Sequence, residues 1–130
     1  MKDQLTVVLA LINSIDGKHL VIHRLKENDY GFPGGKVKED ESLIDALVRE
    51  VQEETGLCLN KENFILINGL VRNENNKELT IFTYAYTDLI SDSVKLTTEE
   101  KHIDPMLMNP ALFYSLTSFK EYYKNLYLEC

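Results

Sequence analysis

The 130-residue chain lacks tryptophan, has only two cysteines, and carries 14 basic residues against 21 acidic ones. The missing tryptophan excludes a tryptophan-based platform for stacking a ligand. Cys58 and Cys130 are too few for a disulfide framework, and Cys58 lies in an apolar run that predicts a buried free thiol. The net charge of -7 argues against a general nucleic-acid scaffold, because such proteins cluster Lys and Arg against phosphates.

No apolar run near the N-terminus is long enough to span a bilayer. Residues 5–12 are apolar, but they lack a basic cluster and an Ala-x-Ala-like cleavage site, so we interpret them as a strand. We therefore expect a cytoplasmic protein without a membrane partner. The length suits one domain with a buried core, and we expect residues 1–130 to form it.

The pattern of apolar residues predicts several strands and one central helix. The expected strands, rich in Val, Ile, Leu and aromatic residues, are 5–13, 19–25, 64–72 and 78–89. The first two flank a turn and predict a hairpin, whereas residues 26–31 predict a loop. Residues 91–109 are the least regular, and Ser118 with Glu121 predicts a capped helix near the C-terminus. This order indicates mixed α/β layers.

The central helix has clear start and stop signals. Ser42 can cap its first turn, with Asp45 three residues later as the capping-box partner. Gly56 suits the left-handed residue that ends a helix. The apolar residues between them recur at helical spacing, which predicts a helix over residues 43–55 with one buried face.

Glu50, Glu53 and Glu54 share one face of this helix, at the edge of its buried side. Three neighbouring carboxylates repel one another, and hard cations such as Mg²⁺ or Mn²⁺ offset that repulsion. Arg49 can pair with Glu53 one turn later and can also reach Glu41, which would orient these acids. On the residues alone, a solvated charged helix face is the more usual explanation of these acids.

The whole segment 35–57 resembles the Nudix box and matches it at every fixed position, which favours a functional site over a plain charged surface. The matching residues are Gly35, Glu41, Arg49, Glu50, Val51, Glu53, Glu54, Gly56 and Leu57. The preceding Phe32-Pro33-Gly34 also resembles the family. The resemblance implies a Nudix fold, an α/β/α sandwich around a mixed β-sheet. It also implies hydrolysis of a nucleoside diphosphate linked to another group.

The resemblance further implies a metal site that holds Mg²⁺ or Mn²⁺. Glu50, Glu53 and Glu54 resemble its carboxylate ligands, and the carbonyl of Gly34 resembles a further ligand. By the same resemblance, Arg49 and Glu41 orient the acids. We expect Glu53 to assist deprotonation of water, although some family members use a general base outside the box.

Family members often add a downstream acid to this set. Glu99 and Glu100 are the candidates here, and we favour Glu100 as the extra metal ligand. The alternative is that Thr97 and Glu100 form the capping box of a short helix.

Substrate contacts are less specific in the sequence. Arg24 and Lys36, or Lys38, are candidates for phosphate contacts, although a solvated surface role fits them as well. Asn109 resembles a base-binding Asn of some family members, but an Asn before Pro is also a typical helix N-cap, which we favour. The aromatic residues that either stack on a base or pack in the core are Tyr30, Phe32, Phe82 and Tyr84.

The leading interpretation is a MutT-like, Mg²⁺-dependent Nudix hydrolase that converts a nucleoside triphosphate to a monophosphate and pyrophosphate. Nucleotide sugars, dinucleoside polyphosphates and RNA 5′ ends remain open as substrates. A nucleotide-binding module without turnover is the competing class, and the intact set of acids argues against it. We expect a small nucleotide as partner and no stable nucleic-acid complex. A homodimer is compatible with the family, but no residue pattern identifies an interface.

Overall fold

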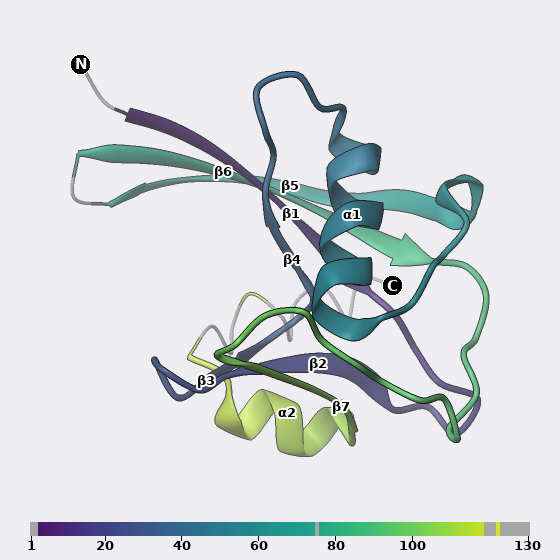
Figure 1. Ribbon diagram of the computed structural model, residues 1–130. Helices are drawn as coiled ribbons and strands as arrows, with labels where there is room; N and C mark the ends of the chain where they lie inside the picture. Colours follow the sequence, from purple (N-terminus) through teal and green to yellow (C-terminus); the bar gives the residue numbers. More distant parts are fainter. Residues whose placement is uncertain (1–2, 75, 119–121, 123–130) are drawn as a thin grey trace.

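The computed structural model describes residues 3–74, 76–118 and 122 of the chain. Strands and helices are mixed along it, as Figure 1 shows. The elements are β1 (Asp3–Leu11), β2 (His19–Arg24), β3 (Asp29–Gly31), β4 (Gly34–Lys36), α1 (Leu43–Thr55), the short 3-10 helix η1 (Lys61–Asn63), β5 (Phe64–Glu74), β6 (Lys77–Tyr86), β7 (Ile103–Met108) and α2 (Pro110–Leu116).

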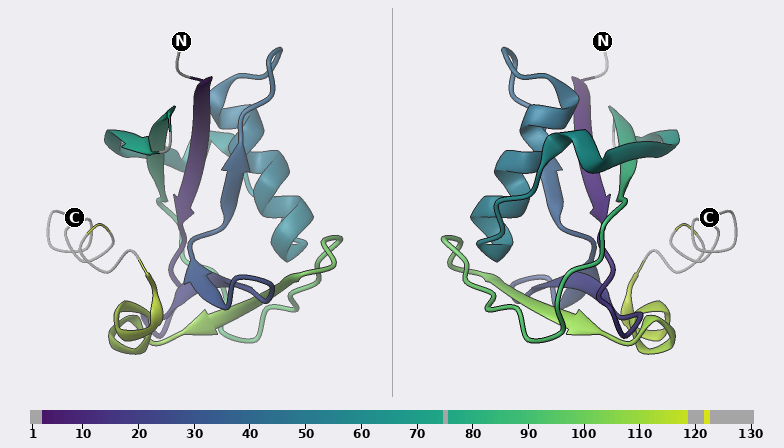
Figure 2. Two further views of the ribbon diagram at one scale, coloured as in Figure 1. Left: turned by 90° about the vertical axis from the view of Figure 1, so that its left-hand side faces the viewer. Right: turned by 90° about the vertical axis from the view of Figure 1, so that its right-hand side faces the viewer.

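The strands form a four-stranded and a three-stranded sheet. The larger has the order β4-β1-β6-β5 and is mixed, because β1 runs parallel to β6 while the other neighbours are antiparallel. The smaller sheet is antiparallel, with the order β3-β2-β7. Helix α1 packs on the larger sheet and α2 packs beside the smaller one (Figures 1 and 2). The expected mixed α/β architecture is confirmed.

The expected hairpin of residues 5–13 and 19–25 is wrong. β1 pairs with β4 and β6, whereas β2 pairs with β3 and β7. The two segments meet only at their ends, through a bridge between Asn13 and His19. The reason is that β1 is apolar on both faces and therefore takes a central position in its sheet. The expected loop 26–31 is also partly wrong, since β3 pairs there with β2.

Helix α1 has the predicted bounds and caps. The Ser42 hydroxyl accepts a hydrogen bond from the Asp45 N–H at 3.2 Å. At the other end Gly56 has φ 79° and donates its N–H to the Gln52 carbonyl. A Cβ at Gly56 would also lie 2.3 Å from the Thr97 hydroxyl oxygen, so glycine is needed there for space as well as for conformation.

Two apolar clusters lie on opposite faces of the larger sheet. One packs α1 against the sheet through buried residues that include Val8, Leu47 and Val51. The other contains Leu11, Phe32 and Phe113 and lies toward the smaller sheet. Side chains alternate between the two faces along β6, since Phe82 and Tyr84 pack against the α1 side and Ala85 against the other.

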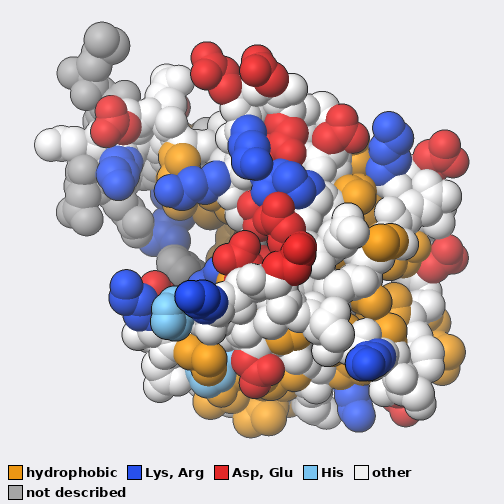
Figure 3. Space-filling model, viewed as in Figure 1, with side chains coloured by type: hydrophobic (Ala, Val, Ile, Leu, Met, Phe, Trp, Pro, Cys, Tyr) orange, Lys and Arg blue, Asp and Glu red, His pale blue; other side chains and the backbone are white. Residues whose placement is uncertain are grey.

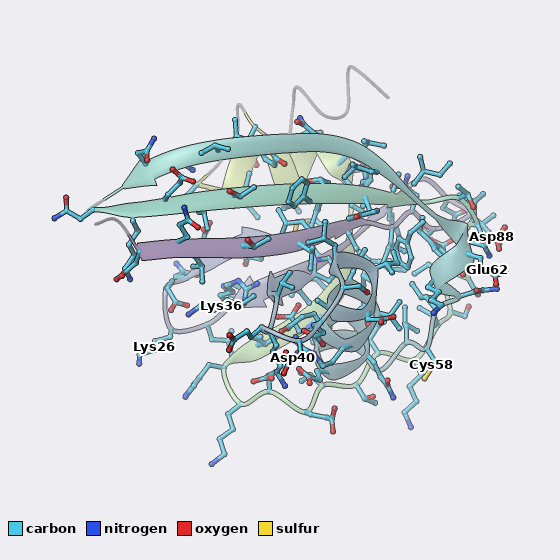
Figure 4. The ribbon with its side chains drawn as sticks, turned by 90° about the horizontal axis from the view of Figure 1, so that it is seen from above. Lys26, Lys36, Asp40, Cys58, Glu62 and Asp88 are labelled. Carbon is cyan, nitrogen blue, oxygen red and sulfur yellow. The ribbon has the colours of Figure 1, made fainter. Side chains whose placement is uncertain are left out.

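Several other expectations have mixed outcomes. Cys58 is exposed (Figure 4), so the buried thiol is wrong; its neighbours Leu57 and Leu59 pack against the core instead. The irregular stretch 91–109 contains β7. Except for Ser118 and Tyr122, the expected C-terminal helix lies outside the described residues, as does Cys130. Among the described residues, no helix is long and apolar enough to cross a membrane.

Candidate active site

Arg49 lies at the centre of a network of acids on α1 and the loop before it. Its Nε and Nη2 donate to the two carboxylate oxygens of Glu41, at 2.6 and 2.9 Å. Its Nη1 lies 2.9 Å from Glu50 Oε1 and 3.3 Å from Glu53 Oε2. Nη2 also donates to the Lys36 carbonyl at 3.1 Å. The pairing of Arg49 with Glu41 and Glu53 expected from the sequence is therefore present, and these contacts fix the acids relative to β4.

Glu41 is held as a carboxylate. The Arg49 hydrogen bond and the Lys38 N–H, which donates at 3.0 Å, lower the pKa of Glu41 to about 2. A fork of two charge-assisted hydrogen bonds also fixes the plane of the guanidinium. Glu41 therefore keeps its charge at physiological pH and orients Arg49, which in turn orients Glu50 and Glu53.

Glu54 lies in a different environment from the rest of the network. It is only 2% exposed, and its Oε1 accepts a hydrogen bond from the Gly34 N–H at 2.8 Å. Its Oε2 lies 3.5 Å from Arg24 Nη1. Burial raises the pKa of Glu54 to about 7, although the Gly34 N–H and Arg24 oppose this shift. Burial likewise raises the pKa of Glu50, and Arg49 opposes it. Both acids therefore hold their negative charge at a cost, which a cation would relieve.

The glycine pair before α1 is needed for close approach. A Cβ at Gly34 would lie 1.9 Å from the Val8 carbonyl oxygen, and a Cβ at Gly35 would lie 2.6 Å from the Glu50 carboxyl carbon. In a strand, alternate carbonyls point the same way, so the Gly34 carbonyl faces the same side as the Lys36 carbonyl that Arg49 contacts. The Gly34 carbonyl thus points toward α1 and its acids.

The loop 97–100 is attached to the C-terminal end of α1. The Thr97 N–H donates to the Thr55 carbonyl at 3.0 Å, and the Glu99 N–H donates to the Glu53 carbonyl at 2.9 Å. Glu100 lies near enough that its charge raises the pKa of both Glu50 and Glu54. No helix forms at 97–100; the Thr98 hydroxyl accepts from the Glu100 N–H instead. The alternative of a capped short helix is therefore wrong, and Glu100 stays a predicted ligand.

The donor set fits a hard divalent cation. Among the described residues, no three acidic, histidine or cysteine side chains converge on one point, because Arg49 lies between Glu41, Glu50 and Glu53. The available donors are nevertheless all oxygens, and burial, which raises the pKa values of Glu50 and Glu54, disfavours their charged forms unless a cation lies nearby. Figure 3 shows a group of acidic side chains near the centre of one face of the molecule, beside basic ones.

A cavity of about 190 Å³ adjoins this network on the other face of the larger sheet. Its walls are mainly apolar, with Arg24, Asp29, Arg72 and Tyr122 as the polar residues among them. The apolar part is contributed by Val7, Leu9, Gly31, Phe32, Leu70, Leu79 and Ile81, with Tyr30 beside them. Arg24 belongs both to this wall and to the contact with Glu54, so it connects the cavity to the acids.

The remaining candidates from the sequence differ in whether they line the cavity. Asn109 is the N-cap of α2, and its side-chain oxygen accepts from the Ala111 N–H at 2.9 Å, which confirms the capping role. Asn109 does not line the cavity. Lys36 is exposed on β4 (Figure 4). Of the four aromatic candidates, Tyr30 and Phe32 line the cavity, whereas Phe82 and Tyr84 pack toward α1.

Sequence reasoning missed three of the polar residues that line the cavity: Asp29, Arg72 and Tyr122. Asp29 lies within the expected loop 26–31. Arg72 ends an expected strand, and its register opposite Leu79 puts it on the cavity face. That register is shifted by a bulge between Leu66 and Asn68, which the sequence pattern does not reveal.

Comparisons with known proteins agree with this architecture. The NUDIX domain model matches residues 3–129. The chain is 39% identical over 59 residues to an 8-oxo-dGTP diphosphatase of Buchnera aphidicola, covering 45% of this chain and 48% of that protein. It is 46% identical over 54 residues to a CTP pyrophosphohydrolase of Escherichia coli, covering 38% and 40%. The matches thus span less than half the length of these curated relatives.

The fold has close counterparts among solved structures. The MutT protein from Methanosarcina mazei Go1 superposes with a TM-score of 0.78 at 21% identity, covering 98% of this chain and 92% of that one. At this identity the likeness concerns the fold alone. The family model, however, matches nearly the entire sequence, including the Arg49 network and the glycine pair. The chain belongs to the Nudix family.

Proposed function

We propose that this protein, as a single domain over residues 1–130, hydrolyses the pyrophosphate linkage of a free nucleoside triphosphate to a monophosphate and pyrophosphate. Mg²⁺ or Mn²⁺ is its cofactor. The observation that carries the proposal is the junction at Arg24, which contacts Glu54 on one side and lines the cavity on the other. Two similar proteins are named 8-oxo-dGTP diphosphatase and CTP pyrophosphohydrolase, which supports a nucleotide substrate.

The residues that would hold the cation are Glu50, Glu53, Glu54, Glu100 and the carbonyl of Gly34. When bound, the cation offsets the charge on the phosphate oxygens and makes water easier to deprotonate. Arg49 and Glu41 keep the acids in fixed directions. Fixed donors matter because positioning and charge stabilisation supply most of the catalysis in phosphoryl transfer.

Glu53 is the proposed acceptor of the proton from water. Its side chain is 31% exposed, so water reaches it, while Arg49 holds it at 3.3 Å. Glu54, by contrast, is buried against Gly34 and suits a ligand role. The assignment separates the two adjacent acids by their access to solvent.

The cavity would take the base of the substrate. Its volume of about 190 Å³ is below the roughly 300–1,000 Å³ that whole small ligands usually occupy, so a single ring system fits it better than a complete nucleotide. Arg24 would then contact the phosphates between the base and the acids. Lys36, exposed on β4 opposite the cavity-lining Val7, and Asn109, at the start of α2, are proposed as further substrate contacts.

A nucleotide panel with Mg²⁺ tests the proposal, with release of phosphate and pyrophosphate measured separately. Glu53→Gln should lower kcat by about 100-fold or more, the usual contribution of a general base, with circular dichroism unchanged. Glu62→Gln on η1 is the matched control, because it makes the same change at an exposed residue outside the Arg49 network and should keep full activity. Wild-type binding of nucleotides without any turnover would instead support the non-catalytic module. Full activity of Glu53→Gln would refute its role.

A further inference from the structure

Tyr122 forms part of the cavity wall from the chain after α2, far from the Nudix box in sequence. Its hydroxyl lies 2.5 Å from the hydroxyl of Thr83. Thr83 is fully buried on β6, on the cavity face of the larger sheet. A buried threonine hydroxyl needs a partner, and Tyr122 supplies one. The contact fixes the tip of the tyrosine against the sheet that forms the cavity floor.

A second contact ties the same part of the chain to the cavity. Both oxygens of Asp29, which also lines the cavity, accept hydrogen bonds from Ser118: Oδ1 from the N–H at 2.9 Å and Oδ2 from the hydroxyl at 2.6 Å. Oδ1 also accepts from the Tyr30 N–H. The carboxylate of Asp29 therefore joins β3 to the chain four residues before Tyr122.

We infer that Tyr122 is a specificity-determining residue, which closes one side of the cavity and limits the size of the base it admits; Asp29 and Ser118 act as positioning residues. This inference rests on the proposed function, since it assigns the cavity to the base. The reasoning is steric: a large aromatic side chain, fixed at its hydroxyl, cannot move aside without breaking the bond to Thr83. The cavity is small, so the position of that ring affects what fits.

The test measures binding of the four common nucleoside monophosphates by calorimetry, without metal, so it does not depend on turnover. Tyr122→Ala should change the ratio of purine to pyrimidine affinity by about tenfold, the scale expected when a pocket gains or loses a small apolar volume. Tyr122→Phe keeps the ring but loses the Thr83 contact, and should change the ratio by about threefold or less. Ser118→Ala should act in the same direction as Tyr122→Phe.

Two controls separate recognition of the base from general damage. Tyr84→Phe removes a hydroxyl from the residue next to Thr83, on the opposite face of the same strand, and should leave all affinities unchanged. Inhibition by Mg²⁺-tripolyphosphate, which lacks a base, should be equal in wild type and Tyr122→Ala. Weakened tripolyphosphate inhibition in Tyr122→Ala would mean structural damage and would overturn the inference.

The outcomes distinguish this inference from the proposed function. If wild type turns over nucleotides but Tyr122→Ala keeps the same affinity ratios, the inference fails and the function stands. If wild type shows no turnover but the ratios shift as expected, the function fails and the role of Tyr122 stands. Absence of any nucleoside monophosphate binding by wild type would overturn the role of Tyr122.

Discussion

Glu54 and His19 are both 2% exposed and both are driven toward their neutral forms by burial, yet they lie in opposite kinds of environment. Glu54 has other carboxylates nearby, and it contacts Arg24, which lines the cavity. His19 is enclosed by the rings of Phe32, Phe113 and Tyr114. Burial of a titratable group therefore identifies a candidate site only when charge and access to ligand accompany it.

The hydrogen bonds of His19 explain its role. Nδ1 lies 2.6 Å from the side-chain oxygen of Asn13, which can only accept, so Nδ1 carries the proton. Nε2 then accepts from the Tyr114 hydroxyl at 2.9 Å. Both nitrogens of the neutral ring are thus used in holding the turn after β1 against α2. Burial lowers the pKa of His19 to about 4, which keeps the ring neutral.

The largest effect on activity is expected for a substitution at Glu54. Glu54→Gln removes a charge that the proposed metal site needs, and should lower kcat/KM by about 1,000-fold, equivalent to about 4 kcal/mol. Folding should be retained, because the glutamine oxygen can still accept from the Gly34 N–H. Steady-state kinetics and thermal melts check both parts. Activity within tenfold of wild type would exclude Glu54 from the site.

The next largest effect is expected for a substitution at His19, and it concerns the stability of the fold. His19→Leu leaves the Asn13 oxygen and the Tyr114 hydroxyl without their ring partner, and should cost about 3 kcal/mol in free energy of unfolding. Urea denaturation measures it. His23→Leu is the matched control on the same strand, since His23 contacts Asn28 in an exposed position and should cost far less. Equal losses in the two variants would contradict a special role for His19.

The pH dependence of stability should separate the two residues by sign. The folded pKa of His19 is about 4 against an ordinary 6.5, so the unfolded chain binds more protons between these values and stability falls on acidification. The folded pKa of Glu54 is about 7 against 4.5, so its contribution is present at low pH and is lost as pH rises through 7.

The two contributions oppose each other between pH 4.5 and 6.5. Relative to wild type, His19→Leu should gain stability on acidification across this window and Glu54→Gln should lose it, each by about 2 kcal/mol. Urea denaturation at several pH values gives both curves. Parallel curves for the two variants would mean that burial does not shift these groups in opposite senses.

The smallest effect is expected for a substitution at Arg24, which connects Glu54 to the cavity. The Arg24–Glu54 pair is long at 3.5 Å and Arg24 is 36% exposed, so the ion pair itself adds little to stability. Arg24→Gln should therefore leave the melting temperature nearly unchanged while lowering kcat/KM by about fivefold, mostly through KM, because one phosphate contact is lost. Lys26→Gln, two residues later on the loop after β2, is the control. An effect on kcat alone would place Arg24 elsewhere in the reaction.

The parts of this fold that the sequence predicts are those with local causes. Helix α1 begins at Ser42 and ends at Gly56 because both caps are short-range, and the Arg49 contacts follow from helical spacing. The position of β1 depends on its parallel pairing with β6, some seventy residues away, which no local pattern specifies. The hairpin expectation failed for that reason.

The cavity depends even more on residues that lie far apart in the sequence. Its wall combines β1, β3, β5 and β6 with Tyr122, and a bulge in β5 decides which side chains of that strand face it. The box therefore predicts the acids but not the surface beside them. The sequence also does not predict the full burial of Glu54, because the helix pattern alone places this residue at the edge of the buried face.

The attachment of loop 97–100 to α1 has a dynamic consequence. Helices usually fray at their last turn, since the final carbonyls lack partners within the helix. Here the N–H groups of Thr97 and Glu99 bind the carbonyls of Thr55 and Glu53. We therefore expect the turn that carries the acids to open less readily than a free helix end, with amide exchange as the measurement. The same two bonds tie the loop that carries Glu100 to the turn that carries Glu53.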